Sequence, residues 1–106
     1  MSRRDGYSMA VKENRFQAQL IRELKEQYPG CTVLKNDSSY LQGVPDLLIL
    51  HGKHWAALEC KRDPKARHQA NQDYYVQKLN EASFARFIDP TNKEEVLNEL
   101  QQAFRD

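Results

Sequence analysis

Two acids and a lysine occupy the ends of two apolar runs in the segment "GVPDLLILHGKHWAALECKR" (43–62). Asp46 opens the first run, and Glu59 and Lys61 close the second. Carboxylate oxygens suit Mg²⁺, which proteins often hold through one or two carboxylates. The remaining coordination positions of the ion are left to water and a substrate phosphate. A neighbouring lysine can balance negative charge in a transition state. These residue types therefore favour the hydrolysis of a phosphodiester.

The two apolar runs predict an antiparallel hairpin whose connection is "HGKH" (51–54). Counting outward from this connection pairs Leu50 with Trp55, and then Asp46 with Glu59. Because side chains in a strand alternate between its two faces, these acids project to one face together with the lysine. The alternative is a weak surface pair on an edge strand. The strongly apolar flanks and the register favour a converged site.

The remaining chain predicts the elements that must position these charges. Phe16, Leu20, Leu24 and Tyr28 recur every four residues, which is typical of a helix with one apolar face. The expected elements are a helix from Val11, strands over 31–35, 46–50 and 55–61, a helix over 69–81, a strand over 84–88 and a final helix. This α-β-β-β-α-β-α order predicts an α/β fold with a single mixed sheet flanked by helices.

Length and composition are those of one soluble domain. The chain has 106 residues, of which 40% are hydrophobic and 29% charged. We expect a flexible arm over residues 1–10 and a single domain over 11–106. The apolar runs are too short to span a membrane, and no secretory signal is evident. Cys31 and Cys60 lack metal-binding spacing, which favours reduced structural thiols and a cytoplasmic location. His51 and His54 lie in the hairpin connection, and we interpret them as turn residues rather than zinc ligands.

Basic residues gather in two parts of the sequence although the net charge is only +1. The first group is Arg3, Arg4, Lys12 and Arg15; the second follows the proposed site. We expect contacts with DNA phosphates from Lys35, Arg62, Lys65, Arg67 and His68. The alternative is a solvated basic loop.

Pro45–Asp46, followed after an apolar strand by Glu59–Lys61, resembles the motif of the PD-(D/E)XK nuclease superfamily. The stretches "GVPDLLIL" and "ALECKR", with a later helix that carries a glutamine, look most like the VRR-NUC family, whose smallest members are stand-alone phage-type or bacterial nucleases. The resemblance covers roughly residues 11–88. It implies a restriction-endonuclease-like core and the cytoplasm of a bacterial or phage-infected cell.

Residue by residue, the resemblance implies a metal site and a catalytic lysine. Asp46 and Glu59 would hold Mg²⁺, for which Mn²⁺ substitutes, and the main-chain carbonyl of Cys60 would be a third ligand. Lys61 would be the catalytic lysine.

Two further positions match the family and leave alternatives open. Glu13 matches the family's helix acid and lies three residues before Phe16, on the apolar stripe; an acid in a first helical turn is also favourable without any function. Gln72 matches the family's glutamine and faces the sheet. Gln69 is a competing candidate, and either glutamine could be an ordinary flank residue.

The combined expectation is a Mg²⁺-dependent endodeoxyribonuclease, with 5′-phosphate and 3′-hydroxyl products implied by the resemblance. The resemblance also suggests a homodimer that resolves branched DNA such as Holliday junctions. One alternative is a nuclease of the same fold that acts on flaps, nicks or duplexes. Others are a catalytically silent DNA-binding or assembly module and a structural domain without a DNA role.

Overall fold

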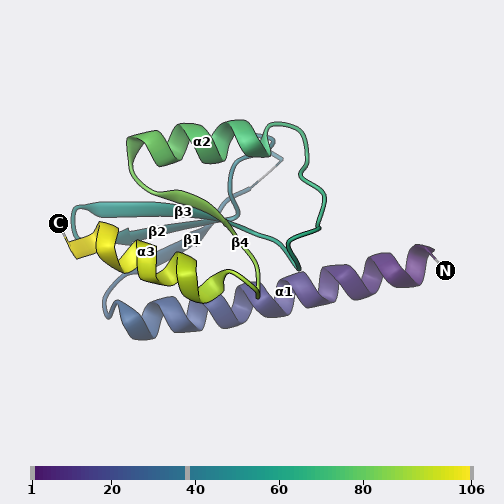
Figure 1. The fold of residues 1–106 in the computed structure, drawn as a ribbon, viewed down its shortest axis with the longest axis horizontal. Helices are drawn as coiled ribbons and strands as arrows, with labels where there is room; N and C mark the ends of the chain where they lie inside the picture. The colour runs from purple at the N-terminus through teal and green to yellow at the C-terminus, as the bar shows by residue number, and fades with distance from the viewer. Residues whose placement is uncertain (1, 38, 106) are drawn as a thin grey trace.

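The computed structural model describes residues 2–37 and 39–105, with side chains described from residue 11 onward. The elements are α1 (Ser2–Gln27), β1 (Thr32–Lys35), β2 (Leu47–His51), β3 (His54–Cys60), α2 (Gln72–Ala82), β4 (Ala85–Ile88) and α3 (Lys93–Arg105). The strands form one mixed sheet in the order β1-β2-β3-β4. Helix α2 covers one face of this sheet, and α1 and α3 cover the other (Figure 1). The predicted class, a mixed sheet flanked by helices, is confirmed.

Helix α1 begins earlier than the sequence pattern predicted. Residues 2–10, expected as a flexible arm, belong to this helix, which runs from Ser2 to Gln27 and extends beyond the sheet at its N-terminal end (Figure 1). The segment has no proline, and adding a residue to an existing helix costs far less than starting one. No helix in the described part of the chain is both long and apolar enough to cross a membrane.

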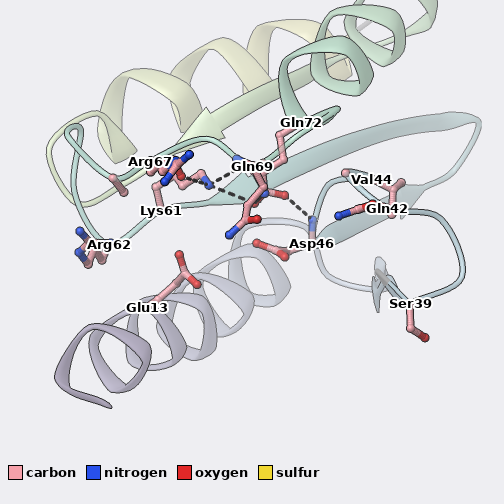
Figure 2. Close-up of a pocket in the computed structure, with 13 residues that line it drawn as sticks. Glu13, Ser39, Gln42, Val44, Asp46, Lys61, Arg62, Arg67, Gln69 and Gln72 are labelled. Carbon is pink, nitrogen blue, oxygen red and sulfur yellow. Dashed lines mark hydrogen bonds and ion pairs between the residues drawn. The ribbon is translucent and has the colours of Figure 1, made fainter. Parts of the chain in front are cut away.

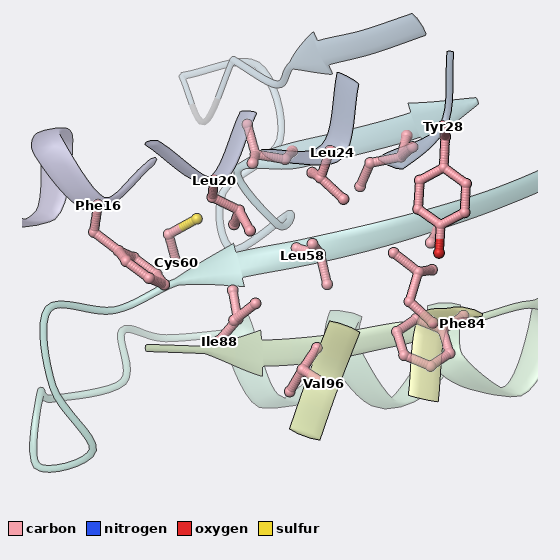
Figure 3. Close-up of a cluster of buried hydrophobic side chains, with 13 residues drawn as sticks. Phe16, Leu20, Leu24, Tyr28, Leu58, Cys60, Phe84, Ile88 and Val96 are labelled. Atoms are coloured by element: carbon pink, nitrogen blue, oxygen red, sulfur yellow. The ribbon is translucent and has the colours of Figure 1, made fainter. Parts of the chain in front are cut away.

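The core lies between the sheet and the pair α1 and α3 (Figure 3). The apolar stripe of α1 is buried as predicted, and Leu20 and Leu24 are fully inaccessible. Burying one such leucine contributes roughly 1.5–3 kcal/mol. The core members that pack against this stripe are Leu47, Ile49, Ala56, Leu58, Cys60, Phe84, Ile88, Val96 and Leu100. This packing fixes the position of α1 against the sheet, and with it the side of the helix from which Glu13 projects.

The β2–β3 hairpin has the register that the sequence predicts. Leu50 pairs with Trp55 and Leu47 with Leu58, so the next step outward pairs Asp46 with Glu59. The connection contains Gly52 with φ 62°, a conformation that glycine adopts without steric cost. β3 also pairs in parallel with β4, and α2 forms the crossover between them. β3 is therefore an inner strand, and charges near its end are enclosed by neighbouring elements.

Candidate active site

Asp46 and Glu59 meet at the open end of the hairpin, and the carboxylate of each accepts a hydrogen bond from a backbone amide of the opposite strand end. The Asp46 amide donates to Oε1 of Glu59 at 3.2 Å, and the Cys60 amide donates to Oδ2 of Asp46 at 3.0 Å. Asn36 supports this corner, since its side-chain amide donates to the Pro45 carbonyl at 2.7 Å. The two carboxylates are thus fixed by the ends of the strands rather than by a mobile loop.

Lys61 lies beside this pair and is almost fully buried, with 7% of its surface exposed. Its Nζ donates to the Arg67 carbonyl at 3.1 Å and to Oε1 of Gln72 at 2.7 Å. The same ammonium lies 3.8 Å from Oε2 of Glu59. A buried ammonium needs such partners, because an unpaired buried charge is strongly destabilising. The lysine is therefore held at the site in one orientation.

Gln72 links the lysine to the acid. Its Nε2 donates to Oε2 of Glu59 at 2.9 Å, while its Oε1 accepts from Lys61 and from the Gln69 amide. Of the two candidate glutamines, Gln72 is the one whose side chain contacts the charged residues. Gln69 lines the same cavity and bonds to Gln72 through its backbone.

The loop before β2 makes a close contact with the start of α2. Gly43, with φ 93°, packs against Asn71, the residue before α2, and a Cβ at position 43 would lie 2.6 Å from the Asn71 Cβ. Asn71 itself has a left-handed conformation with φ 72°. Glycine at position 43 therefore allows the loop before β2 to approach the first turn of α2, where Gln72 lies.

These groups line an open cavity of about 760 Å³ (Figure 2). Glu13 projects into it from α1, on the far side of the cavity from Gln72. Glu13, the helix acid matched by the resemblance, thus lines the same cavity as the strand acids, and the charge of Asp46 contributes to raising its pKa. The site thus combines residues from α1, β2, β3 and α2.

The protonation of all three acids is shifted in one direction. Burial, together with the neighbouring Asp46 carboxylate, raises the pKa of Glu59 to about 8. Burial also raises the pKa of Asp46, against the opposing effects of the Cys60 amide and Lys61. The pKa of Glu13 is raised by burial and then by Asp46. For these acids, the attraction of Lys61 therefore offsets only part of the effect of burial.

The residues present suit a Mg²⁺ ion with several water ligands. Among the residues that the structure describes, no three histidine, cysteine or acidic side chains form a metal-binding group. The site instead provides the Asp46 and Glu59 carboxylates, each with lone pairs left after its backbone hydrogen bond. Mg²⁺ is commonly held in this way by one or two carboxylates. The Cys60 side chain lies in the core, and burial raises the pKa of its thiol, so Cys60 could contribute only its main-chain carbonyl.

The five basic residues expected to contact DNA divide into two groups. Arg62 and Arg67 line the cavity (Figure 2). Lys35 lies at the end of β1 next to Leu47, and Lys65 is exposed on the loop after β3; neither lines the cavity. The ring of His68 stacks on Phe87 with centroids 4.0 Å apart and bonds Asp73 at 2.8 Å, outside the cavity.

The rim opposite the arginines was not predicted. It is formed by Ser39, Gln42, Gly43 and Val44, from the loop between β1 and β2 (Figure 2). Such loop residues show no periodicity, so sequence reasoning had no basis for placing them. The glycine immediately before "VPD" was the one available signal, because glycine often marks a close backbone approach.

Comparison of the chain with protein-family models, with curated proteins and with solved structures gives no match.

Proposed function

We propose that this protein is a Mg²⁺-dependent endodeoxyribonuclease with a PD-(D/E)XK-type site on a restriction-endonuclease-like core, similar to the VRR-NUC family. The observation that carries the proposal is the hydrogen-bonded pair Asp46 and Glu59, with buried Lys61 beside it, at the edge of an open cavity. Burying a lysine beside two acids costs stability in a small domain. Proteins retain such groups mainly at functional sites, which favours a chemical role for Lys61.

The metal would be held by Asp46, Glu59 and the Cys60 carbonyl, with Mn²⁺ as a substitute for Mg²⁺. When bound, it would supply a polarised phosphoryl oxygen and a water of lowered pKa. Lys61 is positioned by the Arg67 carbonyl and Gln72, so its remaining N–H can donate a hydrogen bond to the reacting phosphate or to the attacking water and balance the negative charge that develops there. Gln72 is hydrogen-bonded to both Glu59 and Lys61 and so holds these two side chains next to each other.

The cavity also contains groups suited to a nucleic acid backbone. Arg62 and Arg67 line the cavity and would bind phosphates next to the cut, and Glu13 lies close enough to Arg62 for the two charges to interact. The resemblance to the stand-alone members of the VRR-NUC family favours a second copy of this chain as the source of further DNA contacts. We therefore propose that it acts as a homodimer with two equivalent sites on branched DNA, such as a four-way junction.

The first test compares cleavage of a labelled four-way junction, a flap and a linear duplex in Mg²⁺ or Mn²⁺. The wild type is compared with Glu59→Ala and with Glu81→Ala, a matched loss of an exposed glutamate far from the cavity. We expect paired symmetric cuts in the junction by the wild type and Glu81→Ala, and none by Glu59→Ala.

The other outcomes separate the parts of the proposal. Cutting of all three substrates, lost only in Glu59→Ala, would retain the site and refute junction selectivity. Equal cutting by all three proteins would point to a contaminating nuclease. Absence of cutting by the wild type with either metal would refute the proposed nuclease activity.

A further inference from the structure

A second groove, of about 300 Å³, lies along α1 and shares no lining residue with the catalytic cavity. It is lined by Lys12, Arg15, Phe16, Gln19, Pro90 and Lys93. The segment between β4 and α3 forms its second wall where this segment reaches α1 (Figure 1). Three of the six lining residues are cationic and none is acidic, so the groove has the character of an anion site.

The helical geometry of α1 separates the groove from the cavity. At about 100° per residue, Lys12, Gln19 and Arg15 point within about 60° of one another, whereas Glu13, on the apolar stripe, points about 100° away from Lys12 and about 160° away from Arg15. Phe16, 7% exposed, belongs to the core and forms the floor. The two sites are therefore divided by one helix, whose diameter with side chains is about 10–12 Å.

An ion pair holds the second wall in place. Lys93 Nζ lies 2.9 and 3.0 Å from the two carboxylate oxygens of Glu23, which joins the first residue of α3 to α1. This pair neutralises much of the charge of Lys93. Among the side chains that the structure describes, Lys12 and Arg15 form no ion pair. Their two charges are thus available to an external anion.

We propose that this groove binds the phosphate backbone of the same DNA whose scissile phosphate enters the catalytic cavity, through Lys12 and Arg15. The inference rests on the proposed nuclease function for its choice of polyanion. Successive phosphates of one strand rise about 3.4 Å along the duplex, so the thickness of α1 corresponds to about three nucleotides. The groove therefore binds phosphates about three nucleotides from the cut and adds affinity without taking part in the chemistry.

The test is the salt dependence of DNA binding. The variant Lys12→Ala/Arg15→Ala is compared with Lys53→Ala/Arg105→Ala, which removes the same charge from the hairpin connection and the end of α3. Anisotropy of a labelled duplex is measured in Ca²⁺ at several salt concentrations, and cleavage is measured separately in Mg²⁺ at saturating DNA. Each lost phosphate contact lowers the slope of log K against log salt by about 0.9.

We expect the slope to fall by about 2 in the groove variant alone, with its cleavage rate at saturating DNA and its melting temperature unchanged. Equal changes of the slope in both variants would show an effect of net charge only and would refute phosphate binding in the groove. An unchanged slope in both variants would refute it as well. Salt-dependent binding that needs Lys12 and Arg15, without any cleavage by the wild type, would support the groove and refute the nuclease.

Discussion

The two ends of the β2–β3 hairpin both carry polar, titratable residues, but their surroundings differ. At the connection, the rings of His51 and His54 stack on Phe104 at 6.1 and 5.6 Å, and Tyr28 contacts Phe104 edge-on at 5.2 Å. At the open end, Asp46 and Glu59 have no such apolar cover and face a cavity of about 760 Å³. Aromatic rings cover one end of the hairpin, the closed end. At the other end, hydrogen bonds position two carboxylates at the edge of a cavity.

This difference indicates what each end contributes. Aromatic pairs stabilise a fold beyond the area that they bury, so the closed end contributes to stability. Neighbouring acids whose pKa values are raised by burial cost stability once they ionise, and proteins retain such arrangements mainly at functional sites. We therefore expect substitutions at the open end to affect activity, and those at the closed end to affect the free energy of unfolding.

The largest effect is expected from Lys61→Met, which keeps most of the aliphatic stem and removes the charge. Loss of one preorganised charged donor should lower the single-turnover cleavage rate by about 10²–10³-fold. Lys65→Met, on the exposed loop nearby, should leave the rate within about twofold. Rates are measured at saturating DNA in Mg²⁺. A variant at position 61 that cleaves as fast as Lys65→Met would show that Lys61 has only a structural role.

Phe104→Ala tests the closed end. Removing this half-buried ring should lower the free energy of unfolding by about 2 kcal/mol, because three aromatic contacts are lost. Urea denaturation measures the loss. Cleavage well below the melting temperature should match that of the wild type. A large loss of activity in folded Phe104→Ala would contradict the division between the two ends.

The two ends also offer a matched pair of glycines. Gly43 and Gly52 both have positive φ, so alanine at either should cost about 1 kcal/mol of stability through backbone strain. Only at position 43 would the new Cβ press against Asn71 and displace Gln72 from Glu59 and Lys61. We expect Gly43→Ala to lower the cleavage rate roughly tenfold and Gly52→Ala to leave it unchanged. Equal rates for the two variants would show that the contact with Asn71 does not position the site.

The sequence was sufficient where periodicity or register applies. Counting from "HGKH" correctly placed Asp46 opposite Glu59, and the four-residue stripe correctly placed Glu13 on the inner side of α1. Both follow from repeating backbone geometry. The start of α1 was wrong because residues 2–10 show no apolar pattern. The Glu23–Lys93 pair joins residues 70 positions apart, and no local signal predicts such a contact.

The last comparison concerns the dependence of stability on pH at the open end. Because the folded state raises the pKa of Glu59 from 4.5 to about 8, the unfolded chain releases this proton first. The contribution of Glu59 to stability is therefore lost as pH rises from about 4.5 to 8. Glu59→Gln cannot ionise, so without divalent metal its melting temperature should exceed that of the wild type by a margin that grows from pH 5 to pH 8.

Mg²⁺ sharpens this last prediction, because a cation bound at the site favours the ionised acids. Adding Mg²⁺ at pH 8 should raise the melting temperature of the wild type and leave Glu59→Gln nearly unchanged, so that the margin narrows. Glu81→Gln, an exposed position, should follow the wild type at every pH with and without the metal. A margin that does not depend on pH would mean that Glu59 is ionised in the folded state at little cost. A margin that grows with pH but ignores Mg²⁺ would mean that the open end is a strained acid pair without affinity for the ion.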